Sequence, residues 1–90
     1  MEKQVEIIVE GKVQGVYFRK STKEIAQLLD ITGFVKNESN GNVLIQASGT
    51  ATQIDQFITW CKTGPPAAGV TNVTTQDKEL EAFNSFEIQK

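Results

Sequence analysis

The chain has 90 residues, of which 39% are hydrophobic and 22% are charged, and its formal net charge is −2 at pH 7. This size and composition predict one globular domain with a modest core, and the acidic balance argues against general binding to nucleic acid, which needs a basic surface. The sequence contains no His and a single Cys, Cys61, which excludes catalysis by histidine, a disulfide within the chain and a metal site built from cysteines.

The first third of the chain predicts a strand, a loop and a helix. Apolar residues alternate with glutamates over residues 5–9, which is typical of a strand with one buried face. A loop that contains two glycines follows over residues 11–18, and apolar residues at helical spacing then predict a helix over residues 18–29. Ser21 and Glu24 form a capping-box pattern, which favours a later start for this helix.

The middle of the chain predicts a hairpin. Gly33 is expected to end the helical region, and residues 34–37 then predict a second strand. Residues 38–41 have the composition of a turn and end in Asn-Gly, which is the strongest hairpin signal in the chain. Residues 42–49 predict the third strand.

The last third predicts a second helix and two more strands. Residues 52–62 place apolar side chains, Cys61 among them, on one helical face, so Cys61 is expected in the core. Glycines and two prolines over residues 63–69 end this helix. A threonine-rich fourth strand is expected over residues 70–77 and a short last strand over residues 85–89.

The order of these elements is β-α-β-β-α-β. Two β-α-β halves predict an α+β fold, the ferredoxin-like two-layer sandwich, in which a four-stranded antiparallel sheet carries two helices on one face. A short extra strand at the C-terminus is compatible with this plan. The architecture alone fixes no function, because it hosts many.

The loop before the first helix has the parts of an anion site. Glycines allow a sharp turn whose N–H groups point inward, the helix N-terminus adds unpaired N–H groups, and Arg19 can pair with two phosphate oxygens. Asn37 closes the second strand, and the sandwich brings that strand end near the loop. On spacing alone, however, a simple turn before an exposed arginine is the favoured interpretation of the loop, and a turn-forming residue is the favoured interpretation of Asn37.

Two segments of the sequence resemble the acylphosphatase family. These are VEGKVQGVYFRKST at residues 9–22 and GFVKNESNGNV at residues 33–43, and they match the family pattern G-x-V-Q-G-V-x-F-R followed by G-x-V-x-N-x-x-[DN]-G-x-V. The connection GPPAAGV and the segment FEI near the C-terminus are also similar to the family. Lys36 and Asn40 stand where the family more often has Arg and Asp, and neither departure affects the two central residues.

The resemblance implies an enzyme that hydrolyses the carboxyl–phosphate bond of acyl phosphates without metal or cofactor. It implies that Arg19 holds the phosphoryl group, that Asn37 positions the attacking water, and that the first helix begins at Phe18 or Arg19. It also implies a phosphate cradle made by the backbone N–H groups of Gln14, Gly15, Val16, Tyr17 and Phe18.

The chemistry agrees with this substrate class. An acyl phosphate releases a carboxylate, whose conjugate acid has a pKa of about 4, so the leaving group needs no proton. A site with one arginine, a row of N–H groups and one carboxamide therefore suits an acyl phosphate better than an alkyl phosphate ester. The proton of the attacking water is expected on the substrate's own phosphate oxygen, with Glu38 as a competing base.

We expect a single domain over residues 1–90 that works as a monomeric enzyme on a small acyl phosphate, with inorganic phosphate as product and competitive ligand. The sequence has no apolar run of transmembrane length and no secretory signal, so we expect a cytoplasmic protein with neither membrane nor nucleic-acid partner. Three alternatives remain: a non-enzymatic domain that binds an anionic metabolite, an RNA-recognition module, and an acylphosphatase-like domain inside a larger carbamoyl-transfer protein.

Overall fold

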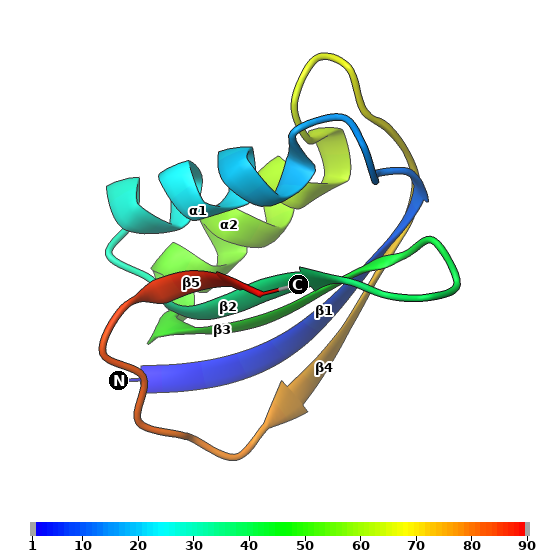
Figure 1. Ribbon diagram of the computed structural model, residues 1–90. Coiled ribbons are helices and arrows are strands. Elements are labelled where there is room, and N and C mark those ends of the chain that lie inside the picture. The colour runs from blue at the N-terminus through cyan, green and yellow to red at the C-terminus, as the bar shows by residue number, and fades with distance from the viewer. Residues whose placement is uncertain (1, 90) are drawn as a thin grey trace.

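A computed structural model describes residues 2–89. It has two layers, with both helices covering one face of a twisted sheet (Figure 1). In chain order the elements are β1 (Glu2–Lys12), α1 (Phe18–Leu28), β2 (Thr32–Asn37), β3 (Val43–Thr50), α2 (Ala51–Thr63), β4 (Gly69–Lys78) and β5 (Phe86–Gln89). None of the helices in this part of the chain is long and apolar enough to cross a membrane.

The predicted ferredoxin-like α+β sandwich is confirmed, with one addition to its sheet. The strand order is β4-β1-β3-β2-β5, and β1 pairs antiparallel with β3 and β4, as does β2 with β3. The C-terminal strand β5 lies parallel to β2, with Gly33 opposite Phe86. The sheet is therefore five-stranded and mixed, because the chain leaves β4 at one edge, crosses below the sheet and adds β5 at the other edge (Figure 1).

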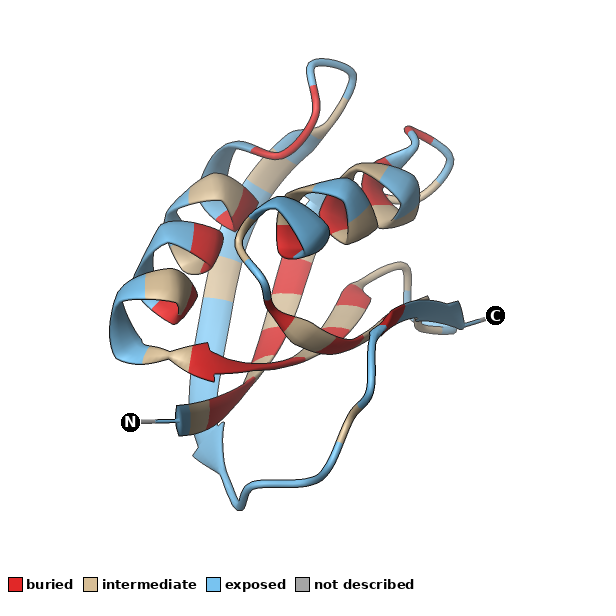
Figure 2. Cartoon of the chain, turned by 90° about the vertical axis from the view of Figure 1, so that its left-hand side faces the viewer, coloured by how far each residue is buried: buried red, intermediate tan, exposed pale blue. Residues whose placement is uncertain are grey.

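The core lies between the sheet and the helices, and Figure 2 shows buried residues on the facing sides of both layers. Val5, Ile7 and Val9 of β1 are buried, as the alternation in the sequence predicted. Cys61 on α2 is also fully buried, and burial raises the pKa of its thiol to about 12. Cys61 is thus a core residue and not a nucleophile, as expected.

The two helix starts differ in how they are formed. α1 begins at Phe18, so the expected start at Phe18 or Arg19 is confirmed over the later start that Ser21 and Glu24 suggested. Tyr17 precedes it with left-handed backbone angles and gives no side-chain cap. α2 begins at Ala51, one residue before the predicted range, because Thr50 and Gln53 form a reciprocal capping box that was missed. The prediction for Gly33 is also wrong, since it lies within β2 rather than at a helix end.

A chain of aromatic rings connects the start of α1 to β5. The ring centroids of Phe18 and Trp60 are 5.5 Å apart, those of Phe57 and Trp60 are 6.5 Å apart, and those of Phe57 and Phe86 are 6.0 Å apart. Such pairs stabilise a fold beyond the area they bury. The first residue of α1 and the first residue of β5 are therefore held by the same side of α2.

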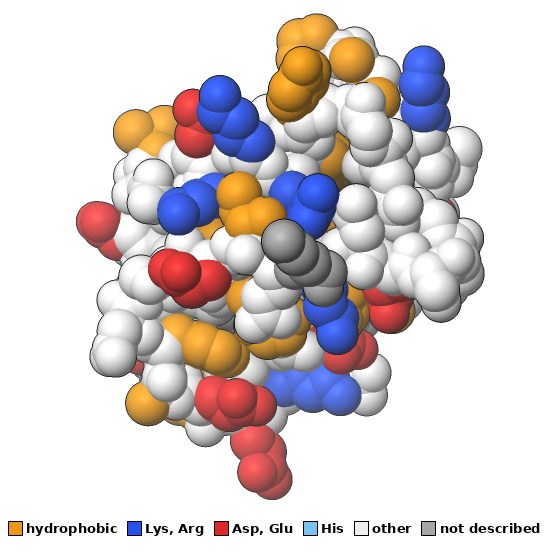
Figure 3. All heavy atoms as spheres, in the orientation of Figure 1, with side chains coloured by type: hydrophobic (Ala, Val, Ile, Leu, Met, Phe, Trp, Pro, Cys, Tyr) orange, Lys and Arg blue, Asp and Glu red, His pale blue; other side chains and the backbone are white. Residues whose placement is uncertain are grey.

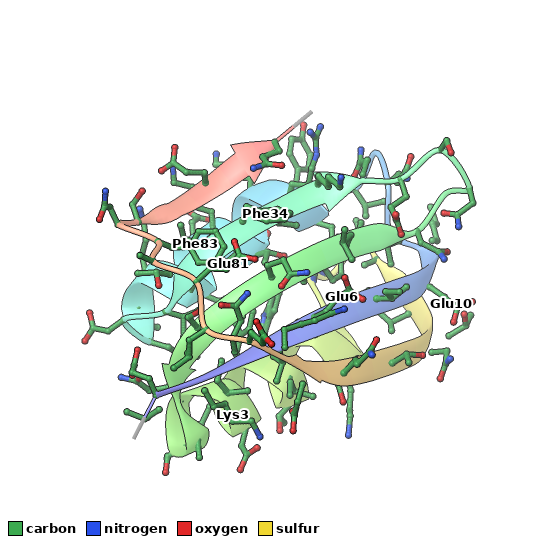
Figure 4. The ribbon with its side chains drawn as sticks, turned by 90° about the horizontal axis from the view of Figure 1, so that it is seen from below. Lys3, Glu6, Glu10, Phe34, Glu81 and Phe83 are labelled. Carbon is green, nitrogen blue, oxygen red and sulfur yellow. The ribbon has the colours of Figure 1, made fainter. Side chains whose placement is uncertain are left out.

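The segment between β4 and β5 crosses the face of the sheet that carries no helices. Gln4, although polar, is buried on that face, and its Oε1 accepts hydrogen bonds from Ser48 Oγ (3.1 Å) and from the backbone N–H of Glu81 (2.8 Å). Phe83 packs edge-on against Phe34 there, with centroids 6.1 Å apart (Figure 4). These contacts attach the crossing segment to the sheet and so lead the chain to β5.

Candidate active site

The turn between β1 and α1 is made by two residues in left-handed backbone conformation. Gly15 has φ 75°, and Tyr17 has φ 62° and ψ 23°. A Cβ atom at Gly15 would have no heavy atom within 4 Å, so glycine is required there by the backbone angle and not by a close approach. Tyr17 carries its left-handed conformation with a full side chain, which is uncommon and is a mark of functional turns.

This turn leaves a row of backbone donors without protein acceptors. Within residues 2–89 no N–H group from Gln14 to Lys20 donates a hydrogen bond, and the first helical bond runs from Ser21 N–H to the Tyr17 carbonyl (3.0 Å). The first turn of α1 contains no acidic residue. Unpaired N–H groups at a helix start carry partial positive charge, so the row forms a site for an anion.

Arg19 lies at the edge of this row, where it is half-buried and oriented by the last strand. Its Nη1 donates a hydrogen bond to the backbone carbonyl of Gln89 (3.0 Å). The guanidinium has further N–H donors, which are available to a ligand. β5 therefore fixes the direction of the arginine, and within residues 2–89 this is the hydrogen bond that its guanidinium makes.

Asn37 is the last residue of β2 and lies on the same pocket. Its Oδ1 is buried and has no hydrogen-bond partner among the described residues. A buried acceptor without a partner costs about 1–3 kcal/mol, and such atoms in folded proteins usually await a water or a ligand. The carboxamide oxygen is thus a free acceptor beside the row of donors.

Arg19, Asn37 and the turn meet at one pocket with a volume of about 390 Å³. Figure 3 shows Lys and Arg side chains on both sides of the apolar side chains over α1 and the end of β5, although the chain as a whole is acidic. The pocket is lined by Val13, Gly15, Tyr17, Phe18, Arg19, Lys20, Asn37 and Ile88.

Most of the predicted site residues come together here, but not all through their side chains. Tyr17 is 78% exposed and lies at the rim of the pocket, whereas the side chains of Val16 and Phe18 are buried in the core. The side chain of Gln14 donates to backbone carbonyls of the turn that follows β2. Val16 and Gln14 can therefore serve the pocket only through their backbone.

Four participants at this pocket were missed: Val13 and Lys20, which flank the predicted loop and Arg19, and Ile88 and the carbonyl of Gln89. The last two belong to β5, and their place depends on a parallel pairing with β2 between residues some fifty positions apart. No local pattern in the sequence signals such a pairing. Within this segment, the apolar residue Ile88 is the one signal of a contact with the rest of the protein. The sequence alone does not distinguish it from a core residue, because its exposure depends on the order of the strands in the sheet.

The described residues provide neither a metal site nor a carboxylate for acid–base catalysis at this pocket. Across residues 2–89 there is no group of three or more His, Cys, Asp or Glu side chains placed to hold a metal ion. Among the described residues, none that lines the pocket carries a carboxylate. The arrangement can hold an anion with N–H groups and a guanidinium. It can also orient a neighbouring molecule that donates a hydrogen bond to the carboxamide oxygen of Asn37.

The chain is similar to known proteins both in sequence and in fold. The model of the Acylphosphatase family matches residues 5–88. An acylphosphatase of Acaryochloris marina is 46% identical over 81 residues, which are 90% of this chain and 87% of the relative. The solved acylphosphatase of Coxiella burnetii superimposes with a TM-score of 0.95 at 39% identity, covering 98% of this chain and 93% of that structure.

A larger protein contains the same fold. Full-length HypF, solved in its phosphate- and nucleotide-bound form, aligns with a TM-score of 0.93 at 28% identity, and the match covers 100% of this chain but 12% of HypF. The fold is thus found both as a chain of this length and as a small part of a much longer one.

Replacing Gly15 with Ala should weaken the anion site while leaving the fold in place. A Cβ atom fits in the space, but the left-handed angle costs a non-glycine residue about 1–2 kcal/mol, and relief of this strain would turn the N–H groups away from the pocket. We expect a loss of that size in the free energy of unfolding and a weaker affinity for inorganic phosphate by titration calorimetry.

Gly69→Ala is the matched control for this substitution. Gly69 is paired with Lys12 at the end of β1, and its added Cβ would lie 3.6 Å from the Lys12 Cβ, an ordinary contact, without a left-handed angle. Its stability and phosphate affinity should both stay near those of the unmodified protein. Unchanged phosphate affinity in Gly15→Ala would show that the angle at Gly15 does not shape the site.

Proposed function

The chain belongs to the acylphosphatase family, and we propose that Arg19 and the N–H row bind the phosphoryl group of the substrate while Asn37 orients the attacking water. Enzymes of this family hydrolyse the carboxyl–phosphate bond of acyl phosphates to a carboxylate and inorganic phosphate. The observation that carries the assignment of roles is the meeting of unpaired donors, a partly free guanidinium and an unpaired buried acceptor in one pocket.

Binding of the phosphoryl group rests on donors that are already in place. The N–H groups of Gln14 to Phe18 and of the first helical turn have no protein acceptor to give up within residues 2–89. Arg19 adds a full positive charge next to them. Donors fixed in this way also stabilise the charge that spreads over the equatorial oxygens in the transition state, because no reorganisation is needed as the reaction proceeds.

The attack requires a water held on the side opposite the leaving carboxylate. The free Oδ1 of Asn37 accepts a hydrogen bond from this water and so aims its lone pair at phosphorus. The new P–O bond forms from the water oxygen, the bond between phosphorus and the carboxyl oxygen breaks, and the carboxylate leaves with the electron pair. The water's proton passes to a phosphoryl oxygen, which is the acceptor nearest to it in this scheme.

The leaving group explains why such a small site suffices. A carboxylate with a conjugate-acid pKa of about 4 departs unprotonated, so the reaction needs no general acid. The sequence has no histidine, and the lining residues that the structure describes include no carboxylate. We further propose that the reaction proceeds without metal and that one copy of this domain is sufficient, since one chain supplies the whole pocket lining.

Removing the guanidinium tests the binding role. Arg19→Ala should keep its fold and lower kcat/KM for acetyl phosphate by about 10³-fold or more, in the range measured for a catalytic arginine in phosphoryl transfer, with a comparable loss of phosphate affinity. The assay is run in excess EDTA beside p-nitrophenyl phosphate, which should be hydrolysed far more slowly by the unmodified enzyme.

Lys20→Ala controls for charge alone, because Lys20 lines the same pocket and carries the same charge but is exposed. Its activity should stay within about tenfold of the unmodified enzyme, since an exposed charge acts weakly through water. Near-normal turnover in Arg19→Ala would rule out the proposed role. Phosphate binding without any turnover in the unmodified protein would favour a non-enzymatic anion-binding domain.

Removing the carboxamide tests the role in catalysis. Asn37→Ala should lower kcat by about 10²–10³-fold, the effect of losing one preorganised polar group, while inorganic phosphate binds nearly as before. Asn72→Ala is the control, because the amide of Asn72 bonds Glu10 and Thr74 on the exposed surface of β4. Equal losses of turnover and phosphate affinity in Asn37→Ala would make Asn37 a phosphate ligand instead.

A further inference from the structure

We propose that the side chain of Gln14 is a positioning residue, which holds Asn37 at the correct distance from the phosphate cradle. Its Nε2 donates two hydrogen bonds, one to the Glu38 carbonyl (2.8 Å) and one to the Asn42 carbonyl (2.9 Å). This inference rests on the proposed function, because it assigns Gln14 an effect on turnover that acts through Asn37.

The cradle and Asn37 share one pocket but follow strands that are not paired with each other. The cradle follows β1 and Asn37 ends β2, and β3 lies between these two strands in the sheet. Two strands with a third strand between them lie about 10 Å apart. Among residues 2–89, the two bonds from Gln14 are the hydrogen bonds that join the loop 13–17 to the turn 38–42.

The turn after β2 does not need Gln14 for its own shape. Glu38 N–H donates to the Asn42 carbonyl (2.8 Å), Gly41 N–H donates to the Glu38 carbonyl (3.1 Å), and Asn40 Oδ1 accepts from Asn42 N–H (3.0 Å). Each carbonyl that Gln14 contacts therefore already accepts one bond within the turn. A carbonyl oxygen has a second lone pair, and Gln14 occupies it on both. The bridge consequently places a preformed turn relative to the cradle.

The position of the Asn37 carboxamide depends on the placement of the turn, because no described residue donates a hydrogen bond to its side-chain oxygen. Asn37 directly precedes Glu38, and its backbone pairs with Val43 at the end of the β2–β3 ladder. Its Oδ1 has no partner among the described residues. The position of the carboxamide therefore follows from the backbone on either side, and the Gln14 bridge holds one of those sides.

The chemistry of the bridge requires a primary amide of this length. One nitrogen with two N–H groups serves two carbonyl oxygens at once. Glutamate would turn an oxygen toward both carbonyls, and methionine has the same reach but no donor. The cradle uses only the backbone N–H of Gln14. A change in the Gln14 side chain therefore removes the bridge to the turn and leaves the N–H group that serves the cradle.

Gln14→Met should therefore lower kcat by about 10- to 100-fold, the effect of a displacement of about 1 Å near the reacting atoms, and change the dissociation constant for inorganic phosphate by less than about twofold. Gln4→Met is the matched control, because Gln4 is also a bonded amide but lies on the open face of the sheet, outside the pocket. Its kcat should be unchanged even if its stability falls.

The decisive measurement combines Gln14→Met with Asn37→Ala in a double-mutant cycle on kcat. If Gln14 acts through Asn37, its replacement should cost little further turnover once Asn37 is absent. Fully additive losses, or a loss of phosphate affinity as large as the loss of kcat, would overturn the proposal. Should Gln14→Met fail to fold, Gln14→Ala, which removes the donor without adding a charge beside the cradle, takes its place in the cycle.

The cycle also separates this inference from the proposed function. Undiminished kcat in Asn37→Ala would overturn the role of Asn37 and with it the role of Gln14. A large loss in Asn37→Ala together with normal kcat in Gln14→Met would overturn the inference about Gln14 alone.

Discussion

The site depends on one feature of the backbone, the turn that leaves β1 and enters α1 with its N–H groups free. A chain normally pairs such groups with its own carbonyls or with side chains. Here Gly15 and Tyr17 take left-handed angles, and within residues 2–89 the donors from Gln14 to Lys20 have no acceptor. The fold thus maintains an arrangement that only solvent or an anion can satisfy, and phosphate is the anion that the family's reaction supplies.

The rest of the structure anchors the helix end of this turn and the arginine beside it. Phe18 is buried at the first position of α1 and contacts Trp60, which connects it through Phe57 to Phe86 at the start of β5. At its other end, β5 offers the Gln89 carbonyl that orients Arg19. The added fifth strand is therefore part of the site, because it supplies both a wall of the pocket and the acceptor that directs the arginine.

The sequence predicted the parts of this site that are encoded locally. The spacing of glycine, Arg19 and the following helix, and the place of Asn37 before a turn, lie within short segments that match a known pattern. The role of the Gln14 side chain could not be predicted, because its partners Glu38 and Asn42 are more than twenty residues away. The parallel pairing of β5 escaped prediction for the same reason, since it depends on where the chain returns and not on local composition.

The starts of the two helices show how local signals in the sequence compete with the path of the backbone. The capping pattern at Ser21 is real as a sequence motif, but Tyr17 reverses the chain earlier and α1 begins before it can act. For α2 the pattern S/T-x-x-E/Q is present as Thr50 and Gln53, and it was missed because Thr50 also ends β3. A single residue there closes the strand and caps the helix that follows.

The central claim is that the backbone donors of the β1–α1 turn, together with Arg19, hold the phosphoryl group. The most direct test is a titration of the isotope-labelled protein with inorganic phosphate, followed by NMR of its amide and guanidinium N–H signals. The account predicts that the largest shifts occur at Gln14 to Phe18 and at the Arg19 side chain, with one common dissociation constant. Saturable shifts centred elsewhere on the protein, with this turn unaffected, would contradict it.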